Sequence, residues 1–139
     1  MDHAGGCHCG NMRAALHLSR TPQESPLRAC GCSFCRAHVT RTVADSEGLF
    51  ELWAGDWSLV EPYRFGSATA DYLVCRRCGV YVAAVCETQA GLRAVVNVNS
   101  FDDRAMFTRD PEPMDYDGET TQARLKRRAV RWMPARLHR

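Results

Sequence analysis

The stretch Tyr72-Leu73-Val74-Cys75-Arg76-Arg77-Cys78-Gly79-Val80-Tyr81-Val82 places a pair of cysteines between two apolar segments. Both segments have the composition of β-strands, and a C-x-x-C turn between them points two sulfurs at one centre. Gly79 eases the bend, because glycine tolerates backbone conformations that other residues avoid. One such pair supplies half of a tetrahedral metal shell, so the sequence predicts that a second pair completes the shell from elsewhere.

Two further cysteine clusters precede this one. The first is Gly6-Cys7-His8-Cys9-Gly10, and the second is Cys30-Gly31-Cys32-Ser33-Phe34-Cys35. Soft thiolate ligands select zinc or iron–sulfur clusters, and these spacings do not match those of ferredoxins. We therefore predict that seven of the eight cysteines bind two zinc ions.

The seven cysteines divide into a compact group of three and a group of four made from two distant pairs: Cys30, Cys32 and Cys35, and Cys7, Cys9, Cys75 and Cys78. Four protein ligands make a closed structural site, whereas three leave a position for water or substrate. This asymmetry predicts catalysis at the three-cysteine site. Alternatively, His38 or Cys86 completes that site, and then both sites are closed.

Short apolar segments separated by turns predict a mainly antiparallel, all-β architecture. Met12, Ala14, Leu16 and Leu18 alternate with less apolar residues, and this period of two is typical of a half-buried strand. The expected strands cover residues 12–18, 27–30, 39–43, 49–53, 59–65, 72–74, 80–85 and 92–98.

The helix that the sequence predicts lies near the C-terminus, at about residues 117–133, with Asp117 or Thr120 as its cap. Leu125, Ala129 and Trp132 share one face of this helix. Residues 120–139 carry seven basic and no acidic side chains, whereas residues 1–119 carry 11 basic and 16 acidic ones. The basic run has no aromatic interleaving and no known binding motif, so we expect a solvated helix face, with a nucleic-acid or acidic-ligand patch as the alternative.

The chain of 139 residues, with 45% hydrophobic and 24% charged content, has the composition of an ordinary globular protein, and we expect one domain over residues 1–139. It contains no apolar stretch of the roughly 18 residues that cross a membrane. The N-terminus has no signal-peptide pattern, so we expect a cytoplasmic location, where cysteines serve metal binding or catalysis rather than disulfides. Cys86, within an apolar run, is expected to be a buried, inert thiol.

Four segments, taken in order, resemble the glutathione-dependent formaldehyde-activating enzyme (GFA) family, which includes centromere protein V. They are Gly6-Cys7-His8-Cys9-Gly10, Cys30-Gly31-Cys32-Ser33-Phe34-Cys35-Arg36, Tyr63-Arg64-Phe65-Gly66-Ser67 and Cys75-Arg76-Arg77-Cys78-Gly79-Val80. The resemblance covers about residues 5–101 and leaves the C-terminal segment as an extension. One departure is Tyr81-Val82-Ala83, where family members commonly have His-Pro-Phe.

The resemblance implies a β-tent zinc fold, with a structural zinc at the four-cysteine group and a catalytic zinc at Cys30, Cys32 and Cys35. It also implies a carbon–sulfur lyase reaction run in reverse, in which a thiol such as glutathione adds to an aldehyde such as formaldehyde. In one variant of this reaction Cys32 detaches and exchanges with the incoming thiol. The competing interpretation is a non-catalytic zinc module that binds a protein or nucleic-acid partner.

Overall fold

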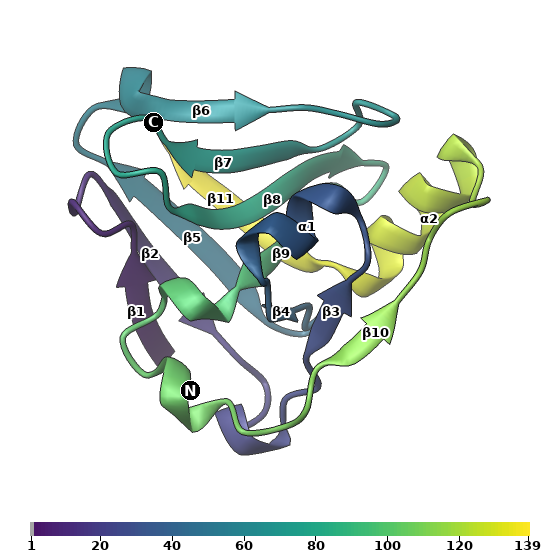
Figure 1. The fold of residues 1–139 in the computed structure, drawn as a ribbon, viewed down its shortest axis with the longest axis horizontal. Coiled ribbons are helices and arrows are strands. Elements are labelled where there is room, and N and C mark those ends of the chain that lie inside the picture. The colour runs from purple at the N-terminus through teal and green to yellow at the C-terminus, as the bar shows by residue number, and fades with distance from the viewer. Residues whose placement is uncertain (1) are drawn as a thin grey trace.

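The computed structural model describes residues 2–139, which form an all-β fold with two short helices (Figure 1). The strands are β1 (Asp2–Gly6), β2 (Met12–His17), β3 (Arg28–Cys30), β4 (Thr42–Val43), β5 (Leu49–Ala54), β6 (Val60–Tyr63), β7 (Asp71–Cys75), β8 (Tyr81–Thr88), β9 (Gly91–Asn97), β10 (Glu112–Met114) and β11 (Met133–His138). The helices are α1 (Ser33–His38) and α2 (Thr121–Arg131), and short 3₁₀ turns lie at Pro22–Glu24, Trp57–Leu59, Val98–Ser100 and Arg104–Met106. The predicted fold class, all-β with a short helix near the C-terminus, is confirmed.

Two groups of strands meet at β11. One group runs β1-β2-β5-β11, and the other contains β6-β7-β8-β9, with β4, β3 and β10 continuing from β9. β11 pairs with β5 through Ala135 to His138 and with β9 through Met133 and Pro134. Most pairs are antiparallel, and β11 with β5 and β10 with β3 are parallel. The C-terminal strand therefore joins the two halves of the fold.

β8 is the most deeply buried strand, with every residue from Tyr81 to Cys86 buried. It lies between β7 and β9, and both of its faces are covered. Val82 and Val85 belong to the main core, whereas Tyr81 and Cys86 belong to a second cluster that includes Trp132 at the end of α2. Helix α2 contacts β8, so the C-terminal helix packs against this second hydrophobic cluster.

Most of the expected strands are present, and three local differences matter. The expected strand over residues 39–43 shrinks to Thr42–Val43, because α1 occupies the preceding residues and ends at Val39 in the left-handed conformation, with φ of 49°. The sequence did not predict helix α1, and it did not predict strands β1, β10 and β11. Thr120 caps α2, as one of the two alternatives predicted, through a bond of 3.1 Å from the Ala123 N–H to its hydroxyl. Neither α1 nor α2 is long and apolar enough to span a membrane.

Two histidines share one carboxylate where β2, β5 and β11 lie side by side. His17 Nε2 is 2.9 Å from Glu51, and His138 Nε2 is 3.0 Å from the other oxygen of Glu51. Hydrogen bonds to Asp2 and then Glu51 raise the pKa of His17, and the bond from His17 lowers the pKa of Glu51. The protonated His17 is therefore the form that favours folding.

The stability from His17 is present below its unfolded pKa and is lost as the pH rises through its raised folded pKa. We expect His17→Gln to cost about 0.5 kcal/mol at pH 5.5, since the pair is partly exposed, and less at pH 8.5. Denaturant unfolding of wild type and variant at both pH values measures this difference. A cost that grows with pH would contradict this assignment.

Candidate metal centres

The first cysteine group joins two loops that are distant in sequence. Cys7 and Cys9 lie between β1 and β2, Cys75 is the last residue of β7, and Cys78 lies between β7 and β8. The four Sγ atoms lie within 4.8 Å of one another, and Cys9 Sγ is 3.6 Å from both Cys7 Sγ and Cys75 Sγ. Zinc–sulfur bonds of about 2.3 Å put the sulfurs of a tetrahedral site about 3.8 Å apart, whereas a disulfide bond is about 2.05 Å long. This donor set therefore fits a zinc ion.

The backbone around this group has the conformation that the ligands require. Gly6 has φ of 146°, and a Cβ atom there would lie 2.1 Å from the Met12 carbonyl oxygen. Gly79 also has a positive φ, of 79°, directly after Cys78. The N–H of Met12 donates to Cys7 Sγ at 3.2 Å, and that of Cys78 donates to Cys75 Sγ at 3.4 Å. Such donors favour the thiolate form of a sulfur ligand.

The cysteine thiols of this group differ in their pKa values. Burial raises the pKa of Cys7 to about 11, and the Asn11 N–H lowers the pKa of Cys9. Burial opposes ionisation of Cys78, but the N–H groups of Cys9 and Val80 outweigh it and lower its pKa to about 6. Four thiolates at this spacing need a cation, which would deprotonate the remaining thiols when it binds.

The second group surrounds the start of α1. Cys30 ends β3, Cys32 is the N-cap of α1, and Cys35 lies in the first turns of that helix. Their three Sγ atoms lie within 4.8 Å of one another, and Cys32 Sγ accepts a bond of 3.4 Å from the Cys35 N–H. The turn into α1 therefore brings sulfurs two and three residues apart to one centre.

No fourth His, Cys, Asp or Glu ligand joins this group among residues 2–139. The ring of His38 packs against Phe34 at 4.5 Å and against Tyr81 at 5.6 Å. Cys86 is buried on β8, as expected, with its Sγ 3.6 Å from Arg128 Nη1. His38 and Cys86, which the sequence offered as a fourth ligand of this site, thus contact other residues instead.

The three-cysteine group ionises first at Cys30. A hydrogen bond from Cys35 lowers the pKa of Cys30 to about 5, and the Arg127 guanidinium acts in the same direction. The same bond raises the pKa of Cys35, and burial raises that of Cys32. One thiolate therefore exists at neutral pH, and a cation would be needed to hold three.

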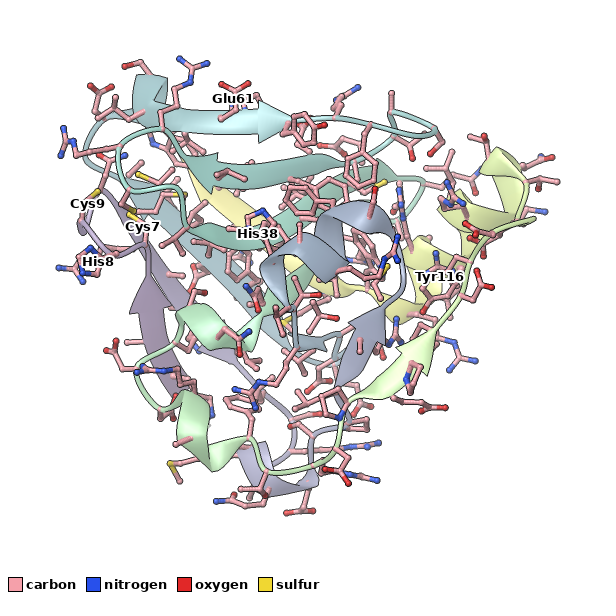
Figure 2. The ribbon with its side chains drawn as sticks, in the orientation of Figure 1. Cys7, His8, Cys9, His38, Glu61 and Tyr116 are labelled. Carbon is pink, nitrogen blue, oxygen red and sulfur yellow. The ribbon has the colours of Figure 1, made fainter. Side chains whose placement is uncertain are left out.

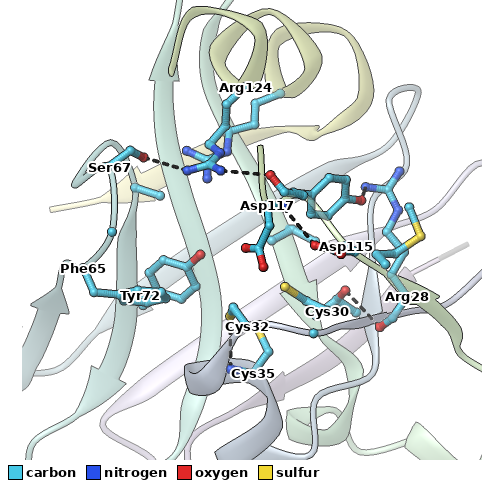
Figure 3. A pocket seen from close by; sticks show the side chains of 18 of the residues that line it. Arg28, Cys30, Cys32, Cys35, Phe65, Ser67, Tyr72, Asp115, Asp117 and Arg124 are labelled. Carbon is cyan, nitrogen blue, oxygen red and sulfur yellow. Dashed lines mark hydrogen bonds between the residues drawn. The ribbon is translucent and has the colours of Figure 1, made fainter. Parts of the chain in front are cut away.

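A cavity of about 440 Å³ opens beside Cys30, Cys32 and Cys35. In Figure 3, Tyr72 and Asp117 extend toward the space above these cysteines, and Arg124 lies at the far wall. Figure 2 shows that Cys7 and Cys9 lie on one side of the molecule and Tyr116, which lines the cavity, on the other. The cavity therefore belongs to the three-cysteine group alone.

The rings of Phe65, Tyr72 and Tyr81 form one wall of the cavity, and Phe34, which does not line the cavity, packs against all three. Phe34 packs edge-on against Tyr72 and Tyr81, each at 4.9 Å, and stacks on Phe65 at 5.5 Å. Burial raises the pKa of Tyr72, so its hydroxyl stays protonated and can donate a hydrogen bond. The hydroxyl of Tyr81 is buried and has no hydrogen-bond partner among the described residues.

Another wall of the cavity comes from α2, and the sequence did not predict it. Lys126 and Arg131 are exposed as expected, but Arg124, Arg127 and Arg128 line the cavity, so the predicted solvated face is wrong for these three. Their signal was present, because Arg128 falls on the helix face of Leu125 and Trp132, at spacings of three and four residues. Because arginine is charged and is seldom buried, its place on the apolar face of the helix does not by itself predict burial.

The fold and the two cysteine groups define an all-β protein with two potential zinc centres, one closed and one open. The model of the family described as glutathione-dependent formaldehyde-activating enzyme (GFA) matches residues 2–115, and the chain belongs to this family. A crystal structure of a Rhodobacter sphaeroides protein is also similar, with 26% sequence identity and a TM-score of 0.54. That match covers 79% of this chain and 97% of the other. Helix α2 and strand β11 lie beyond the part that the family model matches.

Proposed function

We propose that this protein catalyses the addition of a low-molecular-weight thiol, such as glutathione, to an aldehyde, such as formaldehyde. The product is an S-hydroxymethyl thiol, and the reverse reaction is that of a carbon–sulfur lyase. The observation that carries this proposal is the three-cysteine group at the side of a cavity with no fourth protein ligand among residues 2–139. The family description, which names glutathione and formaldehyde, supports the same chemistry.

In this proposal Cys7, Cys9, Cys75 and Cys78 hold a structural zinc, and Cys30, Cys32 and Cys35 hold the zinc of the active site. A zinc ion at three cysteines would lower the pKa of a bound substrate thiol and so make its sulfur nucleophilic at neutral pH. The Cys35 N–H donates a hydrogen bond to Cys32 Sγ. This bond favours Cys32 as a permanent zinc ligand over the variant in which Cys32 detaches and exchanges with the incoming thiol. The reduced thiols that such sites need fit the cytoplasm, where we infer that the protein acts.

The chain's residues would hold the aldehyde and stabilise its oxygen. The new bond joins the substrate sulfur to the carbonyl carbon, and the electron pair of the C=O π bond moves to oxygen. The Tyr72 hydroxyl donates a hydrogen bond to that oxygen as its negative charge grows, and solvent at the cavity mouth supplies the final proton. The aromatic wall of Phe65 and Tyr81, which Phe34 supports from behind by ring contacts, limits the water around the reacting atoms.

We favour this enzyme over a non-catalytic zinc module. A module in which both zinc ions only support the fold has no need of a cavity beside one of them. The α2 side chains that could bind a nucleic-acid or protein partner include Arg124, Arg127 and Arg128, and these three line that cavity. We infer that residues 1–139 act as one domain, with α2 as a wall of the active site.

The direct test is a screen of thiol–aldehyde pairs by NMR exchange spectroscopy, with zinc-loaded protein. We expect the adduct of at least one pair to form faster than in buffer alone. If glutathione and other small thiols form adducts with formaldehyde no faster with the protein than in buffer, the proposal is overturned and the zinc module is favoured.

Loss of the Tyr72 hydroxyl tests the proposed donor. We expect Tyr72→Phe to lower kcat by about 10²-fold, as for the loss of one donor to a developing oxyanion, with unchanged zinc content. Tyr63→Phe is the matched control, because Tyr63 belongs to the same aromatic cluster but does not line the cavity. Equal kcat values for Tyr72→Phe and wild type would exclude the role.

A further inference from the structure

Arg128 is a buried cation on α2, with 6% of its surface exposed. Its Nη1 atom donates to Thr69 Oγ1 at 2.8 Å and lies 3.6 Å from Cys86 Sγ. Its guanidinium carbon lies 4.6 Å from the centre of the Trp132 ring. Its Nε atom is buried and has no hydrogen-bond partner among residues 2–139. The charge is therefore held by neutral groups alone.

The two neighbouring arginines of the same helix differ from Arg128 in this respect. Arg124 and Arg127 both bond to the carboxylate of Glu119, at 3.3 Å and 2.8 Å. Arg128 has no carboxylate partner among the described residues. Cys86 does not supply the missing charge, because its thiol is placed to donate to the Glu87 carbonyl at 3.4 Å. Buried charges are almost always paired, so the environment of Arg128 lacks an anion.

The unpaired guanidinium borders the cavity of the proposed active site. Arg128 and Thr69 both line this cavity, together with Tyr81, which is 1% exposed and whose hydroxyl has no hydrogen-bond partner within residues 2–139. Arg28 lines it too, and within the same residues its side chain bonds only to the Tyr116 hydroxyl, at 3.5 Å. Guanidinium groups bind carboxylates through charge-assisted hydrogen bonds, often two at once. The cavity thus offers donors for an anion near the three cysteines.

We propose that Arg128 forms a carboxylate-binding subsite in this cavity, and that this subsite makes carboxylate-bearing substrates preferred over neutral ones. The inference rests on the proposed function, since the substrate's reacting end would lie at Cys30, Cys32 and Cys35. The carboxylate belongs either to the thiol or to the aldehyde. Because α2 lies outside the family match over residues 2–115, this specificity belongs to the C-terminal extension.

Matched substrate pairs test the subsite and identify the source of the carboxylate. One arm compares 3-mercaptopropionate with 2-mercaptoethanol, both with formaldehyde, and the other compares glyoxylate with formaldehyde, both with 2-mercaptoethanol. In the arm whose carboxylate binds at the subsite, we expect the kcat/KM of wild type to be about tenfold or more higher for the carboxylate substrate than for the neutral one, as for a desolvated charge pair. Arg128→Gln should reduce that ratio to about one, and Arg128→Lys should restore part of it.

Arg131→Gln is the control, because it removes the same charge from the exposed side of α2 and should leave the ratio unchanged. A wild-type ratio near one in both arms, or an equal loss of preference in Arg131→Gln, overturns the inference. If Arg128→Gln does not fold, Arg128→Lys and Thr69→Val are compared instead, and both must lower the ratio.

A binding measurement separates this inference from the proposed function. Propionate and propanol are titrated into the zinc-loaded protein and followed by NMR. Propionate should shift the resonances of the cavity residues in wild type and not in Arg128→Gln. If no thiol is turned over but this difference is present, the proposed function fails and the subsite stands. If propionate and propanol act alike while thiols are turned over, the subsite fails alone.

Discussion

Replacement of Cys75 by alanine is expected to unfold the protein. Cys75 is 1% exposed and connects the start of the β7–β8 loop to Cys7 and Cys9 near the N-terminus. A structural zinc site contributes about 10–16 kcal/mol to folding, which is comparable to the whole stability of a typical domain, about 5–15 kcal/mol. Circular dichroism and bound zinc of Cys75→Ala measure the effect at 25 °C.

Cys86→Ala is the matched control for this prediction. Cys86 is also a buried cysteine, 2% exposed, on the strand that follows the same loop, but it belongs to neither group. Its replacement should cost about 1 kcal/mol, the typical effect of a small change in a core. If Cys75→Ala melts within a few degrees of Cys86→Ala, the four-cysteine group does not stabilise the fold.

Replacement of Cys32 is expected to abolish catalysis and to spare the fold. Zinc should fall from two ions per chain to one in Cys32→Ala, and kcat/KM should drop by about 10³-fold or more, because a bound metal supplies several kcal/mol of stabilisation. Cys32 also caps α1, so the alanine variant should lose about 1 kcal/mol of stability. Metal analysis, adduct formation and denaturant unfolding of the variant together measure these effects.

Cys32→Ser separates the cap from the metal. Serine is a favoured N-cap residue, so this variant should keep the stability that Cys32→Ala loses, while its activity stays low. Wild-type activity in Cys32→Ala, or unfolding equal to that of Cys75→Ala, would contradict the division of the cysteines into a structural and a catalytic group.

The two cysteine pairs and the cysteine triplet could be predicted from local spacing, because a turn of two or three residues brings sulfurs together whatever the rest of the fold does. The union of the two distant pairs followed from the four ligands that a closed zinc site needs. The structure unites the same seven cysteines in the same two groups. Strands β2, β5 and β9 were also visible in the sequence, since their apolar residues alternate or cluster over five or more positions.

The missed elements depend on contacts between distant residues. Helix α1 has six residues and contains one of the ligands, so it is too short for a helical period to show. Strand β11 contains Pro134 and pairs in parallel with β5, whose residues precede it by about 85 positions. The burial of Arg128 results from the packing of α2 on β8. Its place on the helix face of Leu125 and Trp132 was present in the sequence, but the cavity that this side of α2 borders depends on how the whole chain folds.

Crystallography of the zinc-loaded protein, with anomalous diffraction recorded at the zinc edge, measures the coordination of both centres at once. We expect two anomalous peaks, one bonded to four sulfurs and the other to Cys30, Cys32, Cys35 and a ligand from solvent or substrate. A second centre closed by four protein atoms, or a disulfide among these three cysteines, would contradict the account.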